Sequence, residues 1–100
     1  MKKSSIPMEK TLKVKTKNVT ANIRTLRQYR EYSQEYVASK IKISQNGYSK
    51  LELGAIRLTI DHLFGIADVL EVDPLILLTI KPDDVLKTAI SDPVSNPIML

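Results

Sequence analysis

This sequence of 100 residues contains no cysteine and no tryptophan, and aromatic residues make up only 5% of it. Without cysteine the chain can form no disulfide, no thiolate zinc site and no cysteine nucleophile. Such a composition fits a reducing cytoplasm, which we expect as the location. With so few aromatics, the core must consist mainly of Ile, Leu and Val. The length predicts a single domain with tails.

Long apolar runs and secretion signals are also missing. No apolar stretch approaches the roughly 18 residues that a membrane-spanning helix needs, so we expect no membrane partner. The N-terminal residues Met1 to Pro7 are basic, but they lack the apolar stretch of a signal peptide.

Patterns for catalysis are absent as well. The three glycines form neither a phosphate-binding loop nor a dinucleotide fingerprint. The one histidine, His62, falls inside a predicted helix, where a surface or packing role is more common than a catalytic one. The pair Asp83-Asp84 is typical of a helix start, because acidic side chains interact favourably with that end of the helix dipole. We therefore expect no enzyme activity, no cofactor and no metal ion.

What the sequence does contain is an uneven distribution of charge. Residues 1–54 carry twelve basic and four acidic residues, a net +8, whereas residues 55–100 carry three and seven, a net −4. This asymmetry favours a polyanion as the partner of the first half, with nucleic acid ahead of a membrane surface.

Four helix starts of one kind follow one another along the chain. In each, a capping residue stands directly after an apolar residue and four positions before another, the arrangement that fixes a helix start. The four caps are Ser33, Ser44, Thr59 and Asp73. Such residues accept a hydrogen bond from an otherwise unpaired backbone N–H. Four starts within about 45 residues predict an all-α fold of short helices.

The helix boundaries follow from the caps and from Gly54, a helix stop. We predict a first helix from after Asn18 to about Tyr32, followed by helices over 34–40, 45–53 and 60–70 and a fifth that begins at Pro74. Only three residues, 41–43, separate the second helix from the third helix's cap. So short a link is typical of a helix-turn-helix, although any small helical bundle would also fit.

The segments 33–40 and 44–54 resemble the helix-turn-helix family of phage repressor and Cro-like regulators. The residues in register with the family pattern are Gln34, Ala38, Ser44, Ser49, Glu52 and Gly54. The likeness extends from Asn22 to about Leu78. It implies a compact, lambda-repressor-like bundle of about five short helices around a central helix-turn-helix.

The sequence departs from the family pattern in the turn, where Lys42 stands in place of the usual Gly, and at Leu58, where Pro is usual. If Lys42 adopts a positive φ, it is less favourable there than glycine. Gly47, inside the third helix, costs roughly 1 kcal/mol relative to Ala. A close approach to DNA would explain it, and so would simple tolerance.

The resemblance implies that the third helix lies in the major groove of double-stranded DNA. The matching positions for base contacts are Gln45, Asn46, Ser49 and Lys50, whose side chains suit base edges. The corresponding phosphate contacts are Gln34, Lys42 and Arg57. A solvated polar helix face is the plainer alternative for these residues. Glu52 is expected to support the structure, with Arg27 as a candidate partner.

Inward helical spacing predicts the core. Its expected members are Ile23, Leu26, Val37, Ala38, Ile41, Ile43, Tyr48, Leu51, Ile60, Leu63, Ile66, Ala67 and Leu70.

The domain prediction has three parts. Residues 1–18 form a flexible basic arm, with a short strand as the alternative, residues 19–78 form the DNA-binding domain, and residues 79–100 form a C-terminal extension. The arm either wraps the duplex or is a solubilising tail. Surplus apolar residues after residue 74 suggest self-association through the extension, unless it folds back on its own domain.

The function expected from this reading is a repressor that binds a near-palindromic operator as a homodimer. The main alternative is an antitoxin that binds DNA and neutralises a toxin protein. A third reading is a protein adaptor that binds no DNA.

Overall fold

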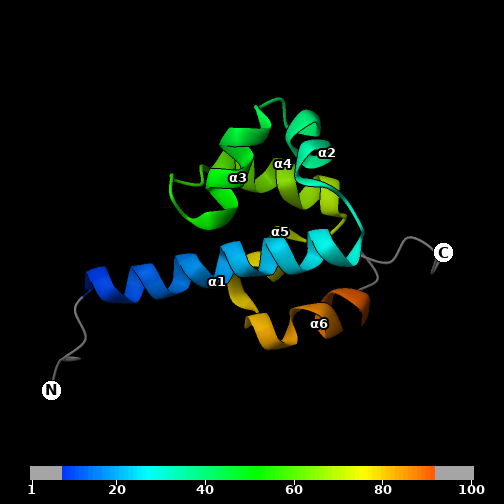
Figure 1. The fold of residues 1–100 in the computed structure, drawn as a ribbon. Helices are drawn as coiled ribbons and strands as arrows, with labels where there is room; N and C mark the ends of the chain where they lie inside the picture. The colour runs from blue at the N-terminus through cyan, green and yellow to red at the C-terminus, as the bar shows by residue number, and fades with distance from the viewer. Residues whose placement is uncertain (1–7, 92–100) are drawn as a thin grey trace, which may run out of the picture.

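The computed structural model describes the backbone of residues 8–91 and the side chains of residues 15–91. Over this range the chain is helical and contains no strand (Figure 1), so the predicted all-α fold is confirmed. The elements are α1 (Met8–Tyr29), α2 (Gln34–Lys40), α3 (Gln45–Leu53), α4 (Ile60–Leu70), α5 (Pro74–Thr79), a short 3-10 helix η1 (Pro82–Asp84) and α6 (Val85–Ser91).

The first helix corrects the prediction for the N-terminal segment. Residues 8–18, expected as a flexible arm or a short strand, form the first turns of α1, which continues without a break to Tyr29. These turns lack a clear apolar period, which is why the pattern missed them. However, they contain neither glycine nor proline, and their lysines are good helix formers. Residues 1–7 of the predicted arm lie outside the described residues.

The middle of the chain follows the sequence prediction closely. The bounds of α2, α3 and α4 and the start of α5 are those predicted from the caps. The side chains of Ser33, Ser44, Thr59 and Asp73 each accept a hydrogen bond from a backbone N–H two or three positions later, at 2.9–3.1 Å. Gly54 ends α3 at φ 78°, in the left-handed region that glycine adopts without strain.

Helix α1 crosses the middle of the molecule, with α2, α3 and α4 on one side and α6 on the other (Figure 1). It contacts α3, α4, α5 and α6, so it is the element around which the others pack. Its side chains Val19, Ile23 and Leu26 are buried in the single core. The side chain of Asn22 is buried as well, and its Nδ2 donates to the carbonyls of Leu77 (3.0 Å) and Ile80 (2.8 Å) at the end of α5.

Most of the predicted core residues are buried, and Ile41 and Ile43 pack against the core while partly exposed. Ile60 is the exception, because it lies at the start of α4, beyond the edge of the core, and remains 64% exposed. The core also contains residues that were not predicted for it, which are Val19, Val72, Ile76, Leu77, Val85 and Ala89.

The C-terminal extension folds back on the domain over the part that is described. Val85 and Ala89 of α6 are buried against the core, and α6 contacts both α1 and α5. The apolar surplus predicted for this segment is therefore covered in part by the chain itself. Residues 92–100 lie outside the described residues.

Candidate nucleic-acid interface

The turn between α2 and α3 fixes the angle between the two helices. Ile43 donates its backbone N–H to the carbonyl of Ala38 at 3.0 Å, which closes the end of α2. Lys42 lies at φ 64°. This is the position where the helix-turn-helix pattern usually has glycine, and the positive φ that the sequence left open is present. A non-glycine residue is less favourable in this region, and the turn keeps the conformation because the helices around it are packed.

The inner face of α3 is held by a buried carboxylate. The Glu52 side chain is fully buried, and the Arg27 guanidinium from α1 binds it through two bonds, Nε–Oε2 at 2.6 Å and Nη2–Oε1 at 3.0 Å. The predicted pairing of these residues is confirmed. Tyr48 Oη donates to Oε2 at 2.6 Å, and Gln34 Nε2 donates to Oε1 at 3.2 Å. This cluster of four residues, the Glu52 cluster, joins α1, α2 and α3.

The electrostatics of the Glu52 cluster are those of a charged pair with hydrogen-bond donors around it. Burial acts to raise the pKa of Glu52, but the bonds from Arg27, Tyr48 and Gln34 outweigh it and leave that pKa below its ordinary value. The bond to Glu52 raises the pKa of Arg27. Burial, together with the bond to Glu52, raises the pKa of Tyr48. Glu52 is therefore ionised and Tyr48 protonated at neutral pH.

The outer face of α3 carries the four residues predicted to contact bases. Gln45, Asn46 and Lys50 are exposed, and Ser49 is half-buried. Asn46, Ser49 and Lys50 lie on the side of the helix away from Tyr48 and Leu51. Gln45 is the first residue of α3 and lies two turns before Glu52, near the edge of the buried face. Gly47 lies among these four residues, and a Cβ there would come within 3.1 Å of Ser44 Oγ, the capping atom. A side chain here would require the capping atom to shift by a few tenths of an ångström.

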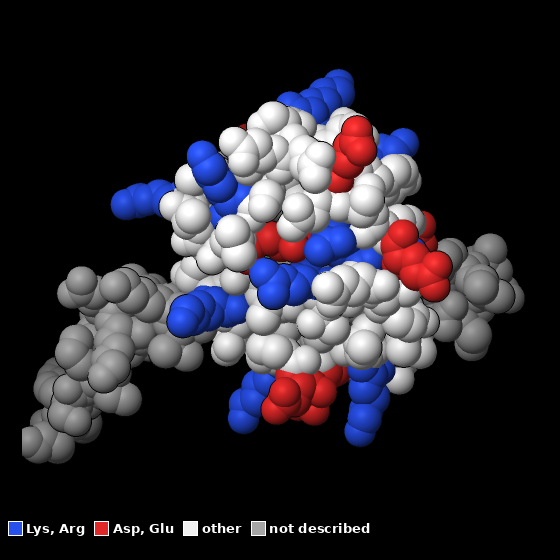
Figure 2. Space-filling model, viewed as in Figure 1, with Lys and Arg blue, Asp and Glu red and all other residues white. Residues whose placement is uncertain are grey.

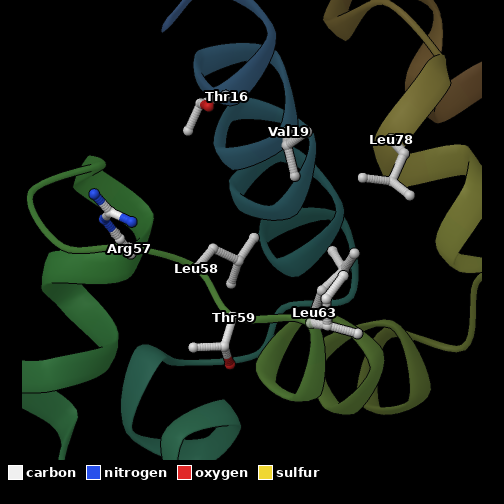
Figure 3. Close-up of a pocket in the computed structure, with 8 residues that line it drawn as sticks. Thr16, Val19, Arg57, Leu58, Thr59, Leu63 and Leu78 are labelled. Atoms are coloured by element: carbon white, nitrogen blue, oxygen red, sulfur yellow. The ribbon is translucent and has the colours of Figure 1, made fainter. Parts of the chain in front are cut away.

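The residues predicted to contact phosphates lie at three places around α3. Gln34 is the first residue of α2 and is half-buried, and its amide nitrogen already donates to Glu52, which leaves it one further N–H. Lys42 is exposed in the turn, and Arg57 is exposed in the loop that follows α3. Figure 3 shows Arg57 on that loop, beside a hollow lined by residues of α1, α4 and α5.

Sequence reasoning did not single out Arg24. Its side chain is 48% exposed on α1, and its Nε lies 3.8 Å from Glu52 Oε1. Because Arg24 precedes Arg27 by three positions, the two guanidinium groups lie about one turn apart on the helix. That spacing could have pointed to Arg24 once Arg27 was expected to pair with Glu52.

The charge on the face seen in Figure 2 is unevenly distributed. Basic side chains follow α1 across the middle of this face, and others lie above them, over α2 and α3. Acidic side chains lie near the C-terminal end of α1, over α2, in the centre between α1 and α3, and below α1 near α6, where basic side chains lie beside them. On this face, basic side chains therefore predominate over α1, α2 and α3.

The described residues carry neither a cluster suited to a metal ion nor a helix suited to crossing a membrane. Among them there is no group of three or more His, Asp or Glu residues that could hold a metal ion. His62 is half-buried in the first turn of α4. None of the helices described is both long enough and apolar enough to cross a membrane.

Comparison with known proteins gives one match. The family model described as helix-turn-helix matches residues 23–77, which include α2, α3, α4 and most of α5. No curated protein and no solved structure matched the chain.

Proposed function

Because the chain belongs to the Cro/C1-type helix-turn-helix family of DNA-binding regulators, we propose that it is a repressor that recognises a near-palindromic operator through α3. The observation that carries this proposal is the division of α3 into two faces. The inner face is buried and bonded to α1 and α2, whereas the outer face offers two amides, a hydroxyl and an ammonium to solvent.

The outer face of α3 has the chemistry for reading base edges. A Gln or Asn amide can bond to N6 and N7 of adenine together, and a Lys can donate to O6 and N7 of guanine. Residues near the N-terminus of a recognition helix are the ones that reach the bases. Gln45 and Asn46 are the first two residues of α3 and are assigned to bases, with Ser49 and Lys50 one turn later.

Phosphate contacts on either side would hold α3 in register. The remaining N–H of the Gln34 amide can donate to one phosphate. Arg57 and Lys42 are exposed and would bind phosphates from the loop after α3 and from the turn. Such contacts position the protein but do not read sequence.

A near-palindromic operator requires two copies of the chain, with their recognition helices about 34 Å apart. Helices α4 and α5 present large apolar side chains to solvent, namely Ile60, Phe64, Leu75 and Leu78. We assign this surface to a second copy, because exposed apolar groups of this size favour association. A chain that stays monomeric on its operator would contradict the dimer, and would leave the surface for a different protein, as an antitoxin requires.

The test is selection of a labelled random duplex library by gel shift, at about 50 mM and about 200 mM salt. The wild type is compared with Gln45→Ala/Asn46→Ala. We expect the wild type to enrich a near-palindromic site, and the double variant to lose that preference while it retains weak, salt-sensitive binding. Lys87→Ala, which changes an exposed side chain on α6, is the control and should select the same site.

Two outcomes would overturn the proposal. If the double variant selects the same site as the wild type, then α3 does not read the bases through these amides. If the wild type enriches no sequence at all, the chain is not a sequence-specific regulator.

A further inference from the structure

The N-terminal half of α1 is a basic helix that the helix-turn-helix match does not include. From Lys10 to Arg30 the sequence has seven basic residues and no acidic one. The family match begins at residue 23, so four of the seven, all lysines, precede it. The first turns of α1 also extend past the neighbouring helices (Figure 1).

By their spacing, four of these seven basic residues fall along one side of the helix. Lys17 and Arg24 are seven positions apart, about two turns, and both are exposed. They lie opposite the buried side chains of Val19, Ile23 and Leu26. Lys13 and Lys10 precede Lys17 by four and seven positions in the same unbroken helix. We call Lys10, Lys13, Lys17 and Arg24 the basic stripe.

Helix α1, which carries the basic stripe, borders two of the three places where phosphates are assigned. At the C-terminal end of the stripe, Arg24 Nε lies 3.8 Å from Glu52 Oε1, the atom that accepts the bond from Gln34. Further toward the N-terminus, Thr16 lines the same hollow as Arg57 (Figure 3). Lys17 directly follows Thr16, so this part of α1 runs from the start of α2 toward the loop after α3.

We propose that the basic stripe binds the phosphate backbone of the DNA duplex, beyond the backbone segment held by Gln34 and Arg57. The placement of the stripe on DNA rests on the function proposed above. From Lys10 to Arg24 the helix rises about 21 Å, the length of about six base pairs. Because the cations are carried by a helix, they are already spaced, and less conformational freedom is lost on binding than with a flexible arm.

Because the stripe consists of Lys and Arg side chains, it would contribute to the affinity for DNA and not to sequence preference. Lysines on a duplex backbone release counterions and add affinity without reading sequence. The stripe would therefore strengthen binding to any duplex and leave the choice of operator to α3. It would also extend the protected region of the backbone past the bases that α3 contacts.

The test compares two variants with the same change of charge in the full chain. Lys13→Gln/Lys17→Gln removes two cations of the stripe, and Lys81→Gln/Lys87→Gln removes two exposed cations near and on α6. Dissociation constants are measured between about 50 and 200 mM salt, on the selected operator and on an unrelated duplex of equal length. Circular dichroism checks that both variants keep the helical content of the wild type.

We expect the stripe variant to lower the log–log salt slope by about 1 to 2 on both duplexes, since each phosphate contact contributes about 0.9. The ratio of operator to unrelated binding should stay unchanged. The α6 variant should keep the wild-type slope. If the two variants have equal salt slopes, the stripe does not bind the backbone. The same conclusion follows if the slope changes on the operator but not on the unrelated duplex.

The two proposals fail in different ways. If the wild type prefers no sequence, the repressor proposal is wrong, but the unrelated duplex still shows whether the stripe binds phosphates. If the wild type binds no duplex even at about 50 mM salt, both proposals are wrong.

Discussion

The two faces of α3 differ in almost every physical respect, although they belong to the same nine residues. On the inner face, Tyr48 and Leu51 are packed in the core and the Glu52 side chain has no exposed surface. On the outer face, Gln45, Asn46 and Lys50 are exposed. The inner face determines where α3 lies, and the outer face determines what α3 can bind.

This difference separates stability from recognition within one helix. The bonds of Glu52 to α1 and α2 fix the position of α3 relative to the rest of the domain. The amides of Gln45 and Asn46, which would contact bases, take no part in those bonds, so we expect that they can be changed without loss of the fold. Residues on the outer face of α3 can therefore specify the operator while they contribute little to the free energy of unfolding.

The largest effect is expected for Glu52→Gln. The substitution removes the counter-charge of Arg27, whose side chain is only 12% exposed, and so leaves a nearly buried cation without its anion. Breaking a buried pair in this way costs about 3–5 kcal/mol of unfolding free energy. Urea denaturation at neutral pH measures the loss.

Glu35→Gln is the matched control, because it makes the same chemical change on the exposed side of α2. Loss of its interaction with the helix dipole should cost less than about 1 kcal/mol. Equal urea midpoints for the two variants would mean that the buried pair does not hold α3 in place.

A smaller effect is expected when the pH is lowered. Because the folded state depresses the pKa of Glu52, its contribution is complete above the ordinary glutamate value of about 4.3 and is lost as the pH falls through the lower folded value. The difference in unfolding free energy between wild type and Glu52→Gln should therefore shrink below about pH 4. Urea midpoints measured from pH 6 downward test this, and a constant difference would contradict the depressed pKa.

The smallest effect on stability is expected for the outer face. Gln45→Ala/Asn46→Ala should change the unfolding free energy by less than about 0.5 kcal/mol, because neither side chain is packed or bonded in the fold. Thermal denaturation followed by circular dichroism gives the comparison. A loss of more than about 1 kcal/mol would show that the outer face also supports the structure, and the two faces would then not be separable.

The accuracy of the sequence prediction differs along the chain for a physical reason. The bounds of α2, α3 and α4 could be read from Ser33, Ser44 and Thr59, because a cap satisfies backbone groups within its own turn. The start of α1 could not be read, since it has neither an identified cap nor an apolar period before Val19. Ile60 was misplaced because periodicity gives the face of a helix but not where the core ends.

The candidate site also contains some features that the sequence predicted and others that depend on tertiary packing. The outer residues of α3 follow from the register of the helix-turn-helix pattern, and the pairing of Arg27 with Glu52 was expected from charge. That Gln34 and Tyr48 also bind Glu52 depends on how α1, α2 and α3 pack, as does the approach of Arg24.

By itself, the sequence determined the helical class, the helix-turn-helix unit with its caps, and the concentration of positive charge in the first half. These features depend on residues close together in the chain, whose hydrogen bonds and periodicity are local. Only the tertiary structure decided that residues 8–18 continue α1, that α6 covers part of the core, and that α1 passes both Gln34, through Arg24 and Glu52, and the hollow beside Arg57. Those outcomes depend on packing between segments far apart in sequence, which local patterns do not encode.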